Sequence, residues 1–87
     1  MKTMMKEIEM IAYFQKEGLP VPLRYRIANE EGELQVIGVD RVLWRKEDKR
    51  AGNLMLTYAC QSEWGGIERR YELRYEAATF RWYLYKI

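Results

Sequence analysis

The side chains best suited to binding stand in the C-terminal segment 69–87, RRYELRYEAATFRWYLYKI, where arginines and tyrosines alternate with glutamates. Guanidinium groups bind phosphate and exposed rings stack on bases, so the pattern is typical of sheet surfaces that bind single-stranded nucleic acid. The alternative is a solvated ladder of charges, in which Glu72 and Glu76 neutralise the arginines. The candidate binding face consists of Arg70, Arg74, Arg81, Tyr83 and Tyr85.

Catalytic chemistry finds little support in the residue types. The chain has no histidine, which removes the commonest general base and the commonest metal ligand. Cys60 is the single cysteine, and its position in an apolar strand pattern predicts a buried thiol without a base to activate it. We therefore expect no enzymatic activity, no catalytic residue, no metal and no cofactor.

Other polar residues could also serve a site. Asp40 and Arg69 are expected on the apolar face of the sheet near one end, either as a polar anchor for a ligand or as an ion pair at the core rim. The segment 46–53 is expected to be a polar loop of mixed charge. Its cations, which could touch phosphate, are Lys46, Lys49 and Arg50.

Length and composition indicate one small domain over residues 1–87. Hydrophobic residues make up 48% and charged residues 32% of the 87-residue chain, a globular rather than disordered balance. The net charge of +2 permits a nucleic-acid partner without singling one out. A small domain with a single cysteine is typical of a reducing cytoplasm, and no stretch is apolar for the length of a membrane span.

Hydrophobic periodicity predicts one helix and then strands. Met4, Ile8, Ile11 and Ala12 recur at helical spacing, and Gly18 followed by prolines is a stop signal, which together predict a helix over residues 3–17. Beyond Pro22 the period becomes two. Strands are expected over residues 22–28, 34–46, 54–64, 67–76 and 80–86.

Turn chemistry predicts how these strands pair. Gly65-Gly66 is a two-residue hairpin turn that places Trp64 opposite Ile67. Comparable reasoning places Ile27 opposite Leu34, Trp44 opposite Leu56, and Tyr75 opposite Phe80, and it also sets Arg74 opposite Arg81. The predicted fold is α+β and mainly β. It has an N-terminal helix followed by a five-stranded antiparallel meander that is strongly curved or closes into a small SH3- or OB-like barrel.

The predicted register leaves surplus apolar residues on the outer face. Ile37, Val39 and Leu43 fall there, where the helix or a partner could cover them. We therefore expect a small intracellular binding domain that acts through protein contacts, with an unidentified protein or as a homodimer. The alternative is weak binding of single-stranded nucleic acid through the arginine and tyrosine face.

Overall fold

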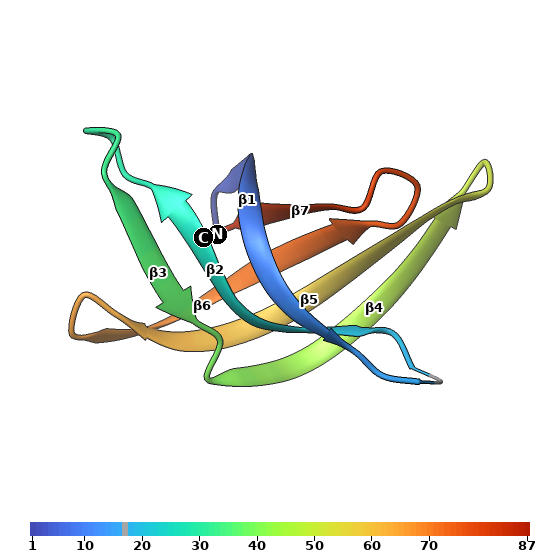
Figure 1. Ribbon diagram of the computed structural model, residues 1–87, viewed down its shortest axis with the longest axis horizontal. Coiled ribbons are helices and arrows are strands. Elements are labelled where there is room, and N and C mark those ends of the chain that lie inside the picture. The colour runs from blue at the N-terminus through green and yellow to red at the C-terminus, as the bar shows by residue number, and fades with distance from the viewer. Residues whose placement is uncertain (17) are drawn as a thin grey trace.

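The computed structural model describes residues 1–16 and 18–87 and is built from seven antiparallel strands (Figure 1). No helix able to cross a membrane occurs in this part of the chain. The strands are β1 (Thr3–Phe14), β2 (Pro20–Ala28), β3 (Leu34–Gly38), β4 (Arg41–Arg50), β5 (Asn53–Trp64), β6 (Ile67–Glu76) and β7 (Arg81–Lys86).

The strands form a single sheet, curled into a half-barrel, in the order β3-β2-β1-β7-β6-β5-β4. β1 belongs to both halves of the sheet, because its first part pairs with β7 and its second part with β2. The β1–β3 half therefore crosses over the β4–β7 half and covers its inner face (Figure 1). Both termini meet beside β1, where the Lys2 amide donates to the Ile87 carbonyl at 2.8 Å.

The predicted N-terminal helix over 3–17 is wrong, and with it the α+β class and the five-strand meander. Residues 3–14 form strand β1, whose inward positions Ile8 and Met10 alternate with outward Glu7 and Glu9. The same apolar residues satisfy a helical period, so spacing alone could not separate the two structures. Pairing between strands favours the strand over the helix. A strand at residues 3–14 lies between β2 and β7 and forms hydrogen bonds with the backbone of both, which would otherwise be open edges of the sheet.

The two C-terminal hairpins keep the predicted faces. Gly65 and Gly66 both have positive φ, and Trp64 pairs with Ile67, so the predicted β5–β6 register is confirmed. In the β6–β7 hairpin Tyr75 pairs with Trp82 rather than Phe80. That is a slip of two residues, and a slip of two preserves the face on which every side chain lies.

The β2–β3 register prediction is wrong by one residue. The predicted turn at Asn29 includes Glu33 as well, so that Ala28 pairs with Leu34 and Ile27 with Gln35. The Asn29 side chain accepts hydrogen bonds from the amides of Glu31 and Glu33, which explains the longer turn. A one-residue slip exchanges the two faces of β3. It moves Ile37 into the core and Val36 onto the surface.

The predicted polar loop 46–53 is also wrong. β4 and β5 continue to Arg50 and Asn53, and only Ala51 and Gly52 form the turn. The charged run looked like a loop because it lacks the apolar alternation of a strand with one buried face. An edge strand does not need that alternation, and inward charges on an edge hinder pairing with other chains. Near the start of β4, a bulge at Leu43 shifts the register of its pairing with β5 by one residue.

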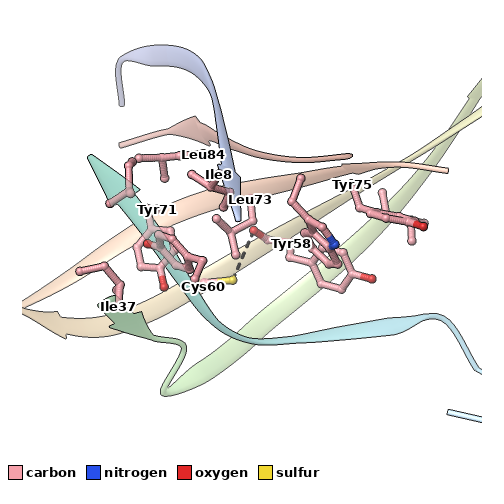
Figure 2. Close-up of a cluster of buried hydrophobic side chains, with 12 residues drawn as sticks. Ile8, Ile37, Tyr58, Cys60, Tyr71, Leu73, Tyr75 and Leu84 are labelled. Carbon is pink, nitrogen blue, oxygen red and sulfur yellow. Dashed lines mark hydrogen bonds between the residues drawn. The ribbon is translucent and has the colours of Figure 1, made fainter. Parts of the chain in front are cut away.

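The core lies between the two halves of the sheet and is rich in tyrosine (Figure 2). Leu56, Cys60, Tyr71 and Leu73 are fully buried there. The Tyr58 hydroxyl donates to the Pro20 carbonyl and so links β5 to β2 across the core. Since buried hydroxyl groups need partners, this hydrogen bond helps to set how the two halves of the sheet pack.

Candidate functional site

The outer face of β4–β7 gathers cations and rings in adjacent rows of paired residues. One row runs Lys46–Thr57–Arg74–Tyr83, the next runs Trp44–Ala59–Glu72–Lys86, and a third runs Arg41–Gln61–Arg70. Directly paired residues project from the same face of a sheet. We call this surface the convex platform. Its projecting side chains are Arg41, Trp44, Lys46, Arg70, Glu72, Arg74, Tyr83, Tyr85 and Lys86.

Small residues lie along the middle of the convex platform. Thr57 and Ala59 of β5 are each only 6% exposed although they lie on the outer face, because the longer side chains of β4 and β6 flank them. Trp44 stands on the β4 side and is 48% exposed. The longer side chains on either side therefore cover β5, and the accessible surface of the convex platform is formed by rings, guanidinium groups and ammonium groups of β4, β6 and β7.

Arg74 is held in place by two neighbours. Its guanidinium carbon lies 3.8 Å from the centre of the Tyr85 ring, and its Nε donates to Thr57 Oγ1 at 3.3 Å. The Lys86 ammonium lies over the same ring at 4.9 Å. A cation held over a ring keeps its charge and retains N–H groups for a ligand. The site thus has an oriented donor rather than a freely rotating one.

The acidic residues near the convex platform are mostly engaged elsewhere. Glu76 accepts hydrogen bonds from Thr79 at 2.6 Å and Asn53 at 3.0 Å, and these bonds lower the pKa of its carboxyl group. Glu72 forms no ion pair within the described part of the chain. The same face also carries Glu63 and Glu68, which pair with each other beside the Gly65-Gly66 turn, so the carboxylates alternate with the cations along β6 without forming ion pairs with them among the described residues.

Most of the predicted binding face comes together. Arg70, Arg74, Tyr83 and Tyr85 all belong to the convex platform. Arg81 stands apart, because its Nε lies 3.5 Å from the Glu7 carboxylate on β1. The expected pairing of Arg74 with Arg81 is wrong: Arg74 pairs with Tyr83 and Arg81 with Glu76. The repulsion that two facing arginines would suffer is therefore absent from this pair.

Trp44, Lys46 and Arg41 complete the face. Sequence reasoning missed Trp44 and Arg41, and it assigned Lys46 to a separate polar loop. The predicted pairing set Trp44 opposite Leu56 and hence in the core, whereas the bulge at Leu43 sets it opposite Ala59 on the outside. A second bulge, at Tyr85 in β7, leaves that ring between Leu84 and Lys86. No sequence signal marks either bulge.

The other candidate sets do not assemble as sites. Ile37 is 5% exposed and Val39 packs on the core, so neither is available to a partner, and Leu43 is half-buried at the bulge. Asp40 accepts a hydrogen bond from the Glu63 amide at 2.8 Å, while Arg69 lies over the Trp64 ring at 5.8 Å. Each is thus held by its own neighbour rather than by the other.

Cys60 and the carboxylates offer no reactive centre. Burial raises the pKa of the Cys60 thiol to about 12, and its Sγ lies against the Tyr58 carbonyl at 3.6 Å. Among residues 1–16 and 18–87, no group of three or more histidine, cysteine, aspartate or glutamate residues is arranged to hold a metal ion.

A groove of about 590 Å³ runs between β1 and the β6–β7 hairpin. Phe14 and Phe80 border it. The Phe14 ring packs edge-to-face on the Tyr75 ring, with 6.2 Å between the ring centres. The charged residues on this groove are Glu7, Glu9 and Arg81, and all three are already paired, Glu7 with Arg81 and Glu9 with Arg26. The groove therefore presents fewer free polar groups than the convex platform does.

No protein-family model matches this chain, and neither a curated protein nor a solved structure matches it.

Proposed function

We propose that this chain is a non-enzymatic binding domain that holds single-stranded nucleic acid on the convex platform. The observation that carries the proposal is the placement of Trp44, Arg74 and Tyr83 on one outer face, on the two sides of the small residues of β5. Rings and guanidinium groups on an open sheet face provide both parts of such binding, base stacking and phosphate contact.

Phosphate contact falls to the cations at the border of the convex platform. Arg41, Lys46 and Arg70 are exposed, and they stand on two strands that flank β5. Arg74 is oriented by Tyr85 and Thr57. Phosphates that cross the strands would meet Arg41 and Arg70 along one row, or Lys46 and Arg74 along another. This is the charge complementarity on which the proposal depends.

Base stacking falls to Trp44 and Tyr83. Trp44 is 48% exposed, the most exposed of the three tryptophans, since Trp82 is 6% exposed and Trp64 packs on the core. Every base has a π-face, so stacking selects unpaired bases without selecting a sequence. A duplex hides those faces, and we therefore expect single strands to bind in preference to duplexes of equal length.

Fluorescence anisotropy of short labelled oligonucleotides tests the proposal. We expect saturable binding of single-stranded RNA or DNA that weakens as salt rises, with a slope of about −0.7 for each phosphate contacted. Arg74→Glu and Tyr83→Ala should each lower the affinity. The matched control is Arg24→Glu, which makes the same charge change at an exposed position on β2, in the other half of the sheet.

Equal loss of affinity in Arg24→Glu and Arg74→Glu would contradict the site, because net charge alone would then explain binding. Equal affinity for base-free polyphosphate would contradict stacking. No binding at low salt would contradict the function itself.

A cytoplasmic location accords with the proposal, since RNA is present there and the thiol of Cys60 stays reduced.

A second candidate function, self-association, is favoured by the exposed edge of β3. This strand ends the sheet, and its Leu34 and Val36 are 58% and 66% exposed. An apolar edge strand with free backbone groups pairs readily with another strand, here that of a second copy. Light scattering over a range of concentrations should show a dimer that Val36→Lys disrupts, and a constant monomer mass would exclude it.

A further inference from the structure

We infer that the convex platform selects guanine among the bases it binds, through the carboxylate of Glu72. This inference rests on the proposed function and adds base preference to it. Glu72 lies in the same row as Trp44, with Ala59 between them. Neighbouring strands are about 4.8 Å apart, so the two residues stand about 10 Å from each other across a buried small residue.

The position of Glu72 is unusual for a surface that binds only phosphate. It is flanked along β6 by Arg70 and Arg74 and pairs across the sheet with Lys86. A carboxylate there repels phosphate and reduces the attraction of these cations for it. It is nevertheless unpaired among the described residues, although cations surround it. A free acceptor in this place suits a ligand group that donates hydrogen bonds.

A base stacked beside Trp44 would direct its Watson–Crick edge across Ala59 toward Glu72. An ionised carboxylate has two acceptor oxygens and no donor. Guanine presents two adjacent donors on that edge, N1–H and the N2 amino group, and so can satisfy both oxygens. Cytosine and adenine present one amino group each, and uracil presents N3–H between two carbonyl oxygens that repel the carboxylate. The expected order of affinity is therefore guanine first and uracil last.

The test compares oligouridine strands that carry one central guanosine, one inosine or an additional uridine. Inosine lacks only the N2 amino group, so it isolates the second hydrogen bond. We expect the guanosine strand to bind on the order of tenfold more tightly than the uridine strand, with inosine between them. In Glu72→Gln the preference should disappear and the uridine strand should bind more tightly, because the negative charge is gone.

Glu68→Gln is the matched control, since it makes the same change on the same strand and face, two rows away beside the Gly65-Gly66 turn. It should keep the guanine preference. Chemical unfolding of both variants confirms that each is folded. Equal affinity for the three strands, with binding still lost in Arg74→Glu, would overturn the guanine preference and leave the proposed function standing. Absence of binding to every strand would overturn both.

Discussion

The guanidinium of Arg74 lies 3.8 Å from the centre of the Tyr85 ring, and this contact depends on a β-bulge. Tyr85 is the extra residue between the pairs Leu73–Leu84 and Glu72–Lys86. Bulges re-aim side chains, and here the bulge places the ring beneath a cation on the outer face. Orientation of Arg74 is therefore a property of β7 as much as of β6.

Replacing Tyr85 by leucine should weaken ligand binding more than it weakens the fold. The half-buried leucine keeps apolar contact but supplies no ring for Arg74, so we expect a stability loss of about 0.5–1 kcal/mol. Oligonucleotide affinity should fall severalfold because the guanidinium is no longer oriented. Urea unfolding and anisotropy measure the two effects. Unchanged affinity would show that the ring does not position Arg74 for a ligand.

Trp44 should report binding directly. Stacking of a base on the exposed indole should quench its fluorescence, and Trp44→Ala should cost about 1–3 kcal/mol of oligonucleotide affinity. Phe80→Ala is the control, because Phe80 is 78% exposed but lies at the β6–β7 turn, off the convex platform. If the two variants lose affinity equally, stacking on Trp44 is not part of the site.

Removing the hydroxyl of Tyr71 should lower the free energy of unfolding, whereas removing that of Tyr25 should not. The Ser62 hydroxyl donates to the Gly38 carbonyl at 2.6 Å, so Tyr71 donates to Ser62 Oγ at 2.5 Å, and Tyr71→Phe should cost about 1 kcal/mol. The Tyr25 hydroxyl is buried without a hydrogen-bond partner among the described residues. Tyr25→Phe should thus leave the free energy of unfolding unchanged or raise it by up to about 1 kcal/mol.

Urea unfolding of both phenylalanine variants measures the contrast. Each change removes one oxygen atom from a ring that is at most 2% exposed, so the two substitutions are closely matched in burial. A large loss of stability in Tyr25→Phe would mean that this hydroxyl has a partner, such as a buried water molecule.

Alkaline pH should destabilise the protein through Cys60. Burial raises the pKa of this thiol from 9.0 to about 12, so the unfolded chain loses its proton at a lower pH than the folded one. The contribution of the protonated thiol is complete below pH 9 and is lost as pH rises toward 12, by up to about 1.4 kcal/mol per pH unit. Tyr58, whose pKa burial also raises to about 12, adds to the loss above pH 10.

The check is chemical unfolding of wild type and Cys60→Ala between pH 8 and pH 11. The variant should be less stable at pH 8 but should lose stability with pH less steeply, because only the tyrosines remain to titrate. Parallel pH profiles would contradict the assignment to Cys60. The wild-type thiol should also resist modification at pH 8 until the protein unfolds.

Ala51→Asn should stabilise the β4–β5 hairpin. Ala51 and Gly52 have φ values of 50° and 82°, the pattern of a type I′ turn, in which asparagine is favoured before glycine. Relief of strain at an exposed alanine with positive φ should raise the free energy of unfolding by up to about 1 kcal/mol. Ala51→Val, which is β-branched, should lower it. A thermal unfolding series of the three proteins decides, and a less stable asparagine variant would contradict the turn.

Local signals were sufficient for the β5–β6 hairpin. Gly65-Gly66 can supply positive φ at both central positions of a two-residue turn, and the alternation on either side of it agrees with only one register. Arg70 and Arg74 could therefore be placed on the outer face from the sequence. Tyr83 kept its face because the β6–β7 pairing differs by an even number of residues.

The sequence by itself determined antiparallel strands with a tyrosine-rich buried face over most of residues 22–86, because period-two patterns and turn residues are local properties. It did not show that the single strand predicted over 34–46 is divided into β3 and β4, at opposite edges of the sheet. Only the tertiary structure decided that residues 3–14 are a strand, since their spacing suits a helix equally and the choice depends on pairing with β2 and β7. It also decided that Trp44 lies on the same outer face as Arg74 rather than in the core. One extra residue at Leu43 reverses the face, and bulges arise from pairing between strands rather than from local preference.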